Sequence, residues 1–265
     1  MASRCGRVQE IWRYPVKSFR GEQLTRAEIT AMGLAGDRAY ALRDRATGRV
    51  MSGKRFARLF ECAARYPDGP SAPPEITLGD GRRLTLDRAA GALSAWLGRE
   101  VEVVRTSADT AASYEIAIQT VDEIEAGVDQ LAIDAGDFPC PPGSFFDAAP
   151  LHVLSDATLT ALREAYPDGR FDVRRFRPNV LVAAEGEVGR VEEGWGGRTL
   201  TIGAVRVSVL MGTIRCVMTT LAQYDLPRDP GILRTVAREA GGNAGVYATI
   251  DRPGTISVGE PVALA

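Results

Sequence analysis

The segment Thr213-Ile214-Arg215-Cys216 places a thiol directly after a guanidinium, at the end of an apolar run. A thiolate is a soft ligand that suits a soft or high-valent metal centre, and a neighbouring cation favours the thiolate form. A single cysteine among apolar residues is also a common small buried side chain. Cys216 is therefore a candidate metal ligand, and the choice depends on which groups the fold brings near it.

Three other short segments carry cationic and hydrogen-bonding side chains. They are Tyr14-Pro15-Val16-Lys17-Ser18, Gly36-Asp37-Arg38 and Arg175-Phe176-Arg177-Pro178-Asn179. Guanidinium forks bind phosphate oxygens in pairs, and a lysine contributes a compact charge. Around one soft thiolate, such a cationic pocket would suit an anionic cofactor that holds a metal. Each arginine taken alone is more typical of a solvated surface.

The basic residues are unevenly divided between the two types. Of 32 lysines and arginines, only Lys17 and Lys54 are lysines. A lysine kept in such a chain indicates a position where the planar fork of arginine is unsuitable. His152 is the single histidine, which argues strongly against a multi-histidine metal site and against a histidine-based catalytic triad. It could donate a proton, but a structural role suits its place just before a predicted helix.

Composition limits the class of protein. The 265 residues are 45% hydrophobic and 25% charged, with a formal net charge of −2. These values are typical of a globular chain and argue against a general nucleic-acid binder. No apolar stretch is long enough to span a membrane, and the N-terminus lacks a hydrophobic signal segment. We therefore expect a cytoplasmic protein with no nucleic-acid or membrane partner.

The cysteines argue against several kinds of site. Cys5, Cys62, Cys140 and Cys216 are widely separated, with no C-x-x-C spacing. Zinc knuckles and ferredoxin-type iron–sulfur clusters need close spacings, and a disulfide framework is unusual without a secretion signal. A chemically important thiol here would act alone.

The hydrophobic pattern predicts a β-rich α/β fold of the α+β type. Short strands joined by turns over residues 5–45 favour a small β-barrel-like N-terminal domain. Period-two runs predict later strands, the clearest at 205–211, which we expect Gly212 to interrupt. Helices are predicted at 89–97, 155–166 and 231–240. We divide the chain into domains 1–105 and 106–265, with the junction somewhere between 105 and 150.

Five short motifs, in their order and spacing along the chain, resemble those of the MOSC family. The family is named for the molybdenum cofactor sulfurase C-terminal domain, and here the likeness includes its N-terminal β-barrel domain. The likeness is greatest to the amidoxime-reducing members and their bacterial relatives. The motifs are Tyr14-Pro15-Val16-Lys17-Ser18, Gly36-Asp37-Arg38, Phe176-Arg177-Pro178-Asn179, Arg215-Cys216-x-x-Thr219-Thr220 and Pro253-Gly254-Thr255-Ile256-x-Val258-Gly259. They span nearly the whole chain.

The resemblance implies a molybdenum–molybdopterin cofactor bound in a cleft between the two parts of the chain. Carried over by motif, Cys216 is the protein ligand to molybdenum and the catalytic residue. The residues expected to hold the pterin and its phosphate, or to line the cofactor, are Lys17, Ser18, Arg38, Arg177, Asn179, Thr213, Arg215 and Tyr247.

The resemblance also implies an activity and a partner. Its relatives reduce N-hydroxylated or N-oxide compounds, such as amidoximes and hydroxylamines, with two electrons. Some bacterial relatives carry a fused iron–sulfur domain. This chain lacks the closely spaced cysteines that such a cluster needs. We therefore expect a separate flavin or iron–sulfur protein as electron donor. Pyridoxal phosphate, associated with the wider family, is doubtful here.

Two alternatives stay open at the level of sequence. One is a non-redox module that carries molybdenum cofactor or sulfur, with a persulfide on Cys216. The other is a plain β-barrel binding protein whose cysteine is inert. Molybdenum content and the chemical state of the Cys216 sulfur separate the three interpretations.

Overall fold

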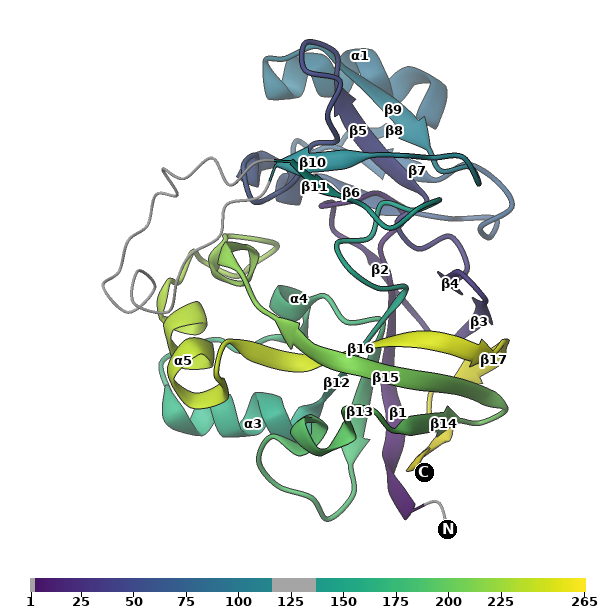
Figure 1. Cartoon of the computed structure of the whole chain (residues 1–265). Coiled ribbons are helices and arrows are strands. Elements are labelled where there is room, and N and C mark those ends of the chain that lie inside the picture. Colours follow the sequence, from purple (N-terminus) through teal and green to yellow (C-terminus); the bar gives the residue numbers. More distant parts are fainter. Residues whose placement is uncertain (1–2, 116–136) are drawn as a thin grey trace.

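The computed structural model describes residues 3–115 and 137–265. Figure 1 shows a larger part built around a β-barrel, which carries both chain ends, and a smaller part above it with α1 and several short strands. The predicted β-rich fold that contains both helices and sheets is confirmed. The domain boundary near residue 105 stays a prediction.

The larger part is a closed seven-stranded barrel. Its strands follow the order β13-β12-β16-β15-β14-β18-β1, and β1 pairs back onto β13 to close the ring, with β2 added beside β1. The strands are β1 (Ser3–Arg13), β2 (Glu22–Leu24), β12 (Leu151–Ser155), β13 (Val180–Ala184), β14 (Thr199–Ile202), β15 (Val205–Ile214), β16 (Asn243–Arg252) and β18 (Pro261–Leu264). Closure leaves the ring without an unpaired edge.

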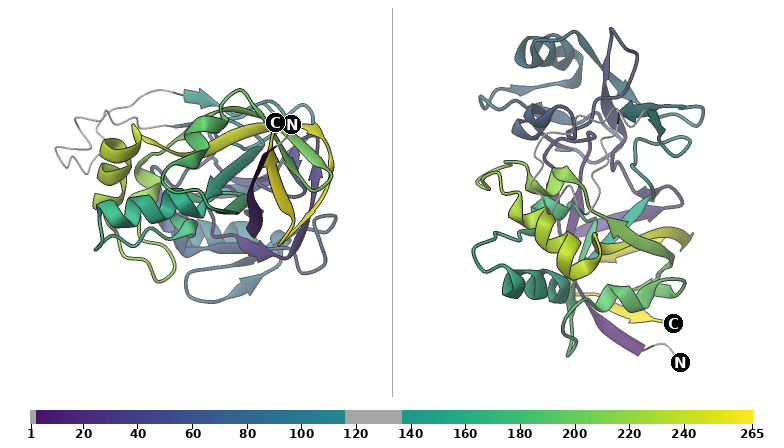
Figure 2. Two further views of the ribbon diagram at one scale, coloured as in Figure 1. Left: turned by 90° about the horizontal axis from the view of Figure 1, so that it is seen from below. Right: turned by 60° about the vertical axis from the view of Figure 1, so that its left-hand side comes forward.

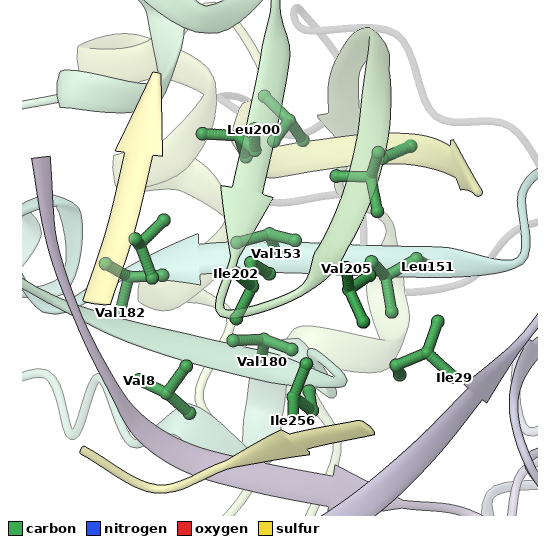
Figure 3. Close-up of a cluster of buried hydrophobic side chains, with 14 of the residues drawn as sticks. Val8, Ile29, Leu151, Val153, Val180, Val182, Leu200, Ile202, Val205 and Ile256 are labelled. Atoms are coloured by element: carbon green, nitrogen blue, oxygen red, sulfur yellow. The ribbon is translucent and has the colours of Figure 1, made fainter. Parts of the chain in front are cut away.

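Alternating apolar residues fill the barrel. Val205, Val207 and Val209 of β15 point inward, as their period of two requires, and meet side chains of the other strands. Figure 3 shows this cluster, in which Leu200, Ile202 and Val205 face the residues of β12 and β13. The predicted strand at 205–211 is thereby confirmed.

The strand does not stop at Gly212, contrary to our expectation. It continues to Ile214, and its register against β16 shifts between Val209 and Met211 and again between Gly212 and Ile214. Such bulges change the direction in which side chains point without ending a strand. The end of β15 is thus turned toward the smaller part of the molecule, and Cys216 follows two residues later.

Helices cover one side of the barrel. α3 (Asp156–Ala165) and α5 (Gly231–Ala240) lie together there, beside the short α4 (Val173–Phe176), as Figures 1 and 2 show. α3 confirms the helix predicted at 155–166, and its N-cap is Ser155, whose Oγ accepts from the N–H of Thr158 at 3.1 Å. α5 confirms the helix predicted at 231–240 and ends at Gly241, which adopts a φ of 54°. Two 3-10 turns, η2 (Val191–Trp195) and η3 (Val217–Thr220), complete this part.

The smaller part is made of short sheets around their own core. β5 pairs with β9, β7 with both β6 and β8, and β10 with β11. A further sheet, in which β3 pairs with both β4 and β17, packs instead against the barrel core through Ala27, Ile29, Leu34 and Ile256. The predicted helix at 89–97 is confirmed as α1, which starts three residues earlier and packs into this core. The elements are β3 (Arg26–Thr30), β4 (Gly33–Leu34), β5 (Tyr40–Asp44), η1 (Ala57–Glu61), β6 (Ala63–Arg65), β7 (Glu75–Thr77), β8 (Arg83–Leu84), α1 (Leu86–Leu97), β9 (Val101–Arg105), β10 (Ser113–Glu115), β11 (Asp137–Pro139) and β17 (Gly254–Ser257).

Among residues 3–115 and 137–265, no helix has the length and apolar character that a helix spanning a bilayer requires.

Candidate functional site

A cavity of about 350 Å³ is lined by residues from both parts of the molecule. This volume lies in the range of small-molecule and cofactor sites. Eight of the nine residues that the sequence singled out line it, so the fold brings together segments up to about 230 residues apart in the chain. The eight are Lys17, Ser18, Arg38, Arg177, Asn179, Arg215, Cys216 and Tyr247.

Cys216 lies at the wall of this cavity. It precedes η3 in an extended conformation, and it is partly exposed, whereas Cys5, Cys62 and Cys140 are buried. The N–H and Oγ1 of Thr219 both donate to the carbonyl of Cys216, at 3.1 and 3.0 Å. The thiol is thus presented to the cavity by a fixed backbone turn and is not packed away in a core.

Arg175 holds this turn in place from behind. Its side chain is fully buried and donates to the carbonyls of Thr219, Leu221 and Pro227, at 3.1, 3.2 and 2.7 Å. A fourth bond goes to the carbonyl of Arg170 at 2.9 Å. Arg175 therefore positions the segment that follows Cys216 and does not reach the cavity.

Arg38 is part of a buried hydrogen-bond network around Asp37. One Asp37 oxygen accepts from the N–H of Tyr14 at 2.7 Å, and the other accepts from the Asn179 amide at 3.0 Å and from the Arg38 guanidinium. Asn179 Oδ1 also accepts from the N–H of His152 at 3.1 Å. This network joins the two parts of the molecule and fixes one wall of the cavity.

Arg177 enters the cavity from the left-handed residue that ends α4. Its φ is 55°, and Ser18 and Arg38 also have positive φ values, 64° and 47°. Three non-glycine residues in this region around one cavity indicate backbone strain that the surrounding packing maintains, as at functional sites. The guanidinium lies over the ring of Tyr14, 4.1 Å from its centroid, and donates to the carbonyl of Phe19 at 2.8 Å.

Arg177 and Arg215 have no carboxylate partner among the described residues. Arg215 donates to the carbonyl of Phe176 at 2.7 Å, while its buried Nε has no partner in the described part of the chain. Burial lowers the pKa of Arg177 to about 10 and also lowers the pKa of Arg215. Buried cations without counterions are costly, so these two groups create a site for an anion.

Lys54, Tyr114 and Asp147 also line the cavity, and the sequence did not assign them to it. The Lys17 ammonium binds one oxygen of Asp147, and the Lys54 ammonium lies 3.1 Å from the other. Burial acts to raise the pKa of Asp147, but the two lysines outweigh it and hold that pKa well below its usual range. The scarcity of lysine was a signal for Lys54, whereas nothing in the sequence around Asp147 singled it out.

His152 and Tyr247 form the barrel side of the cavity. Their rings lie 5.7 Å apart, and the Nε2 of His152 is 3.3 Å from the carbonyl of Ala244. Burial lowers the pKa of His152 well below its usual value, and the nearby Arg215 and Arg38 lower it further. The imidazole is therefore neutral at physiological pH.

Thr213 is the one predicted residue that does not line the cavity. It is fully buried, and its hydroxyl has no hydrogen-bond partner among residues 3–115 and 137–265. Its direct contact with a ligand stays a prediction.

The cavity has a clear surplus of positive charge. Its five cations are offset by the two carboxylates of Asp37 and Asp147, which leaves a surplus of three. In the described part of the chain, no three His, Cys, Asp or Glu side chains are grouped as ligands for a bare metal ion. The donor set therefore suits an anionic molecule that brings further metal ligands with it. The five cations are Lys17, Lys54, Arg38, Arg177 and Arg215.

The fold and the site together define a two-part β-barrel protein with one thiol in a cationic cleft between the parts. Comparison with protein families identifies the class: residues 141–263 match the MOSC domain, and residues 5–126 match the MOSC N-terminal beta barrel domain. The chain belongs to the MOSC family. Membership of this family supports a function related to the molybdenum cofactor.

Known relatives extend over nearly the whole chain. Mitochondrial amidoxime reducing component 2 of Bos taurus is 26% identical over 302 residues, which cover 97% of this chain and 82% of the relative. Mitochondrial amidoxime-reducing component 1 of Homo sapiens is 24% identical over 307 residues, with coverages of 98% and 83%. The solved structure of the YUAD protein from Bacillus subtilis shares the fold, with a TM-score of 0.50 at 11% identity over 100% of this chain and 98% of that one.

Proposed function

We propose that this protein is a molybdenum-cofactor oxidoreductase that removes oxygen from N-hydroxylated or N-oxide compounds. The observation that carries the proposal is the Cys216 thiol at the wall of a cavity with three surplus positive charges. The names of the relatives, which describe amidoxime reduction, support the substrate class.

The residues of the cavity fit such a cofactor on two independent grounds. The buried Nε of Arg215 has no partner among the described residues, and Arg177 has no counterion there, so both can bind phosphate oxygens. Cys216 is a single soft ligand, which suits a metal whose other ligands come from the cofactor itself. Lys17 and Arg38 add charge, and the hydroxyl of Ser18 and the amide of Asn179 add hydrogen-bonding capacity.

When bound, the cofactor supplies the two-electron redox chemistry, with the sulfur of Cys216 as its protein ligand. The overall reaction is R–NHOH + 2 e⁻ + 2 H⁺ → R–NH₂ + H₂O. The protein orients the substrate beside Cys216, and Arg175 keeps the backbone turn of that residue fixed. His152 remains neutral, so its ring adds no charge to a site that is already cationic.

The two electrons come, in this proposal, from a separate flavin or iron–sulfur protein. The four cysteines of the chain are too far apart in sequence for a cluster motif, and none is paired with another. We place the reaction in the cytoplasm. The substrate is a small molecule, because the cavity has the volume of a small-molecule site.

Metal analysis tests the proposal. The wild-type protein, produced in a host that makes molybdenum cofactor, is compared with Cys216→Ser and with the control Cys5→Ser, whose buried thiol contacts the carbonyl of Val262 far from the cavity. We expect about one molybdenum per wild-type and control chain, and turnover of an aryl amidoxime with an artificial reductant. Cys216→Ser should fold and lose turnover by at least about 100-fold.

Other outcomes would decide against the proposal. A persulfide on Cys216 without molybdenum would favour the sulfur-carrier alternative. A Cys216→Ser protein with full reductase activity would show that this sulfur is not the metal ligand. A wild-type protein with neither molybdenum nor a persulfide would leave only a binding protein.

A further inference from the structure

Both lysines of the chain converge on a single carboxylate. Lys17 and Lys54 bind the two oxygens of Asp147, and their ammonium groups lie 4.3 and 4.7 Å from the ring centroid of Tyr114. The other thirty basic residues are arginines. Four chain segments therefore form one cluster, and both cations in this cluster are lysines.

The two lysines are fixed in different ways. Lys17 also donates to the carbonyl of Phe145 at 2.8 Å, which ties its ammonium to the backbone. Lys54 has its ion pair with Asp147 and lines the same cavity as Cys216. The loop of Lys54 also lies against the segment that follows Cys216, because a Cβ built on the neighbouring Gly53 would be 3.4 Å from Cε of Met218.

The loop that carries Lys54 is held rigidly. The N–H of Gly53 donates to Ser18 Oγ at 2.9 Å, and the N–H of Lys54 donates to Ser52 Oγ at 3.3 Å. The N–H groups of Arg55 and Phe56 donate to the carbonyl of Ser52, at 3.0 and 2.9 Å. These bonds fix the backbone of Lys54, and the ion pair with Asp147 holds its ammonium. Ser18 acts here as a positioning residue for Lys54.

An ammonium and a guanidinium would serve different ligands at this position. A guanidinium is a planar fork that matches a pair of oxygens, as in a phosphate or carboxylate. An ammonium is a compact charge with three donors, which suits one small oxygen atom. Two ammonium groups against one carboxylate also leave one positive charge, which Asp147 does not cancel.

We propose that Lys54 is the residue that binds the oxygen of the substrate's N–O bond beside Cys216. This inference rests on the proposed function and assigns Lys54 to the substrate, whereas Arg177 and Arg215 would serve the cofactor. The ammonium holds the oxygen in the ground state and stabilises the negative charge that the oxygen gains as the N–O bond breaks.

Lys54 stays protonated in this reaction. The N–O bond breaks, a new N–H bond forms, and the oxygen leaves as water, which consumes two electrons and two protons. The separate donor protein supplies the electrons, and the solvent supplies both protons. Asp147 keeps the ammonium charged, because it raises the pKa of Lys54 and so outweighs the opposing effect of burial.

The test compares ligand binding by oxidised, molybdenum-loaded protein without reductant, so that no turnover occurs. Calorimetry measures the Kd of an aryl amidoxime and of the matching amidine, which lacks the oxygen. The variants are Lys54→Met, Lys54→Arg and the control Arg26→Met, an exposed residue of β3. In Lys54→Met, Asp147 keeps Lys17 as a partner, so the fold should persist, and the melting temperature checks this.

For Lys54→Met we expect unchanged molybdenum content, a Kd for the amidoxime that is about 10- to 100-fold higher, and an almost unchanged Kd for the amidine. Lys54→Arg should restore only part of the difference. A loss of molybdenum would show that Lys54 anchors the cofactor, and an equal change in both Kd values would show a general electrostatic effect; either overturns the inference. A wild-type protein without molybdenum would overturn the proposed function itself.

Discussion

At the scale of residues, the same side chain plays two different parts in this cavity. Arg38 and Arg177 both have positive φ values and both stack on Tyr14. Arg38 is neutralised by the adjacent Asp37, whereas Arg177 is surrounded by aromatic rings and backbone. Of these two arginines, Arg177 is therefore the one without a counterion among the described residues, and the sequence alone could not distinguish them.

His152 makes a pH prediction that can be assigned to one residue, since it is the only histidine. Its pKa is lowered in the folded protein, first by burial, so the unfolded chain binds the proton more readily. The folded state should therefore lose stability as pH falls below about 6.5, the ordinary histidine pKa, by at most about 1.4 kcal/mol per pH unit. Urea unfolding at pH 7.5, 6.5, 5.5 and 5.0 measures this.

The matched control is His152→Gln, which cannot titrate. The slope between pH 6.5 and 5.0 should disappear in this variant. The loss below about pH 4 should remain, because there the unfolded chain protonates Asp147, whose pKa the folded protein holds far lower. An identical slope in both proteins would mean that His152 does not carry it.

At the scale of elements, the short helix α4 is the piece that couples the barrel to the cavity. Its N-cap is Asp172, which accepts from the N–H of Arg174 at 2.9 Å. Two residues apart, Arg175 points back into the protein and Arg177 points into the cavity. One four-residue helix thus fixes both the turn of Cys216 and the anion site.

We predict that Arg175→Met destabilises this region far more than Arg174→Met does. Loss of Arg175 leaves four carbonyls without their donor, which should cost about 3 kcal/mol or more and lower the melting temperature by about 6–12 °C. Arg174 forms ion pairs at the surface with Asp172 and Asp225, so its loss should have a small effect. Calorimetry gives the temperatures, and hydrogen exchange should show faster opening at residues 217–227 in Arg175→Met alone.

The limits of prediction from sequence are also clearest at this scale. The periodic segments, such as β15, α3 and α5, were predictable because their alternation and caps are local. The bulges of β15 were not, since they depend on pairing with β16. Asp147 lies in an irregular segment and binds Lys17, which is 130 positions away in the chain. No local sequence pattern therefore predicts their contact.

At the scale of the whole molecule, the cavity brings together positive charges from both parts of the chain. Lys17, Arg38 and Lys54 come from segments before residue 60, and Arg177 and Arg215 come from the barrel side. Without an anion, the surplus charge opposes close approach of the two walls. An anion that contacts both walls should therefore stabilise the entire fold.

We predict that inorganic phosphate raises the melting temperature of the cofactor-free protein. Binding to the folded state alone adds about 1.4 kcal/mol at ten times the Kd, which corresponds to a rise of about 3–6 °C. Sodium chloride at equal ionic strength should not reproduce it. Arg177→Gln should lose most of the rise, while Arg82→Gln, which alters an exposed ion pair with Asp80, should keep it. A rise that survives Arg177→Gln would place the phosphate elsewhere.

The pairing of β1 with β18 sets an order of events during synthesis. Ser3 lies opposite Leu264, and Figure 2 shows the two chain ends side by side. The nascent β1 must therefore wait, with one edge open, until residue 264 has left the ribosome. During that time its open edge is a hazard for aggregation, which chaperones would have to shield. Cys216 follows β15 of the barrel that the pairing of β1 with β18 completes. We therefore expect any cofactor to bind only after residue 264 has been synthesised.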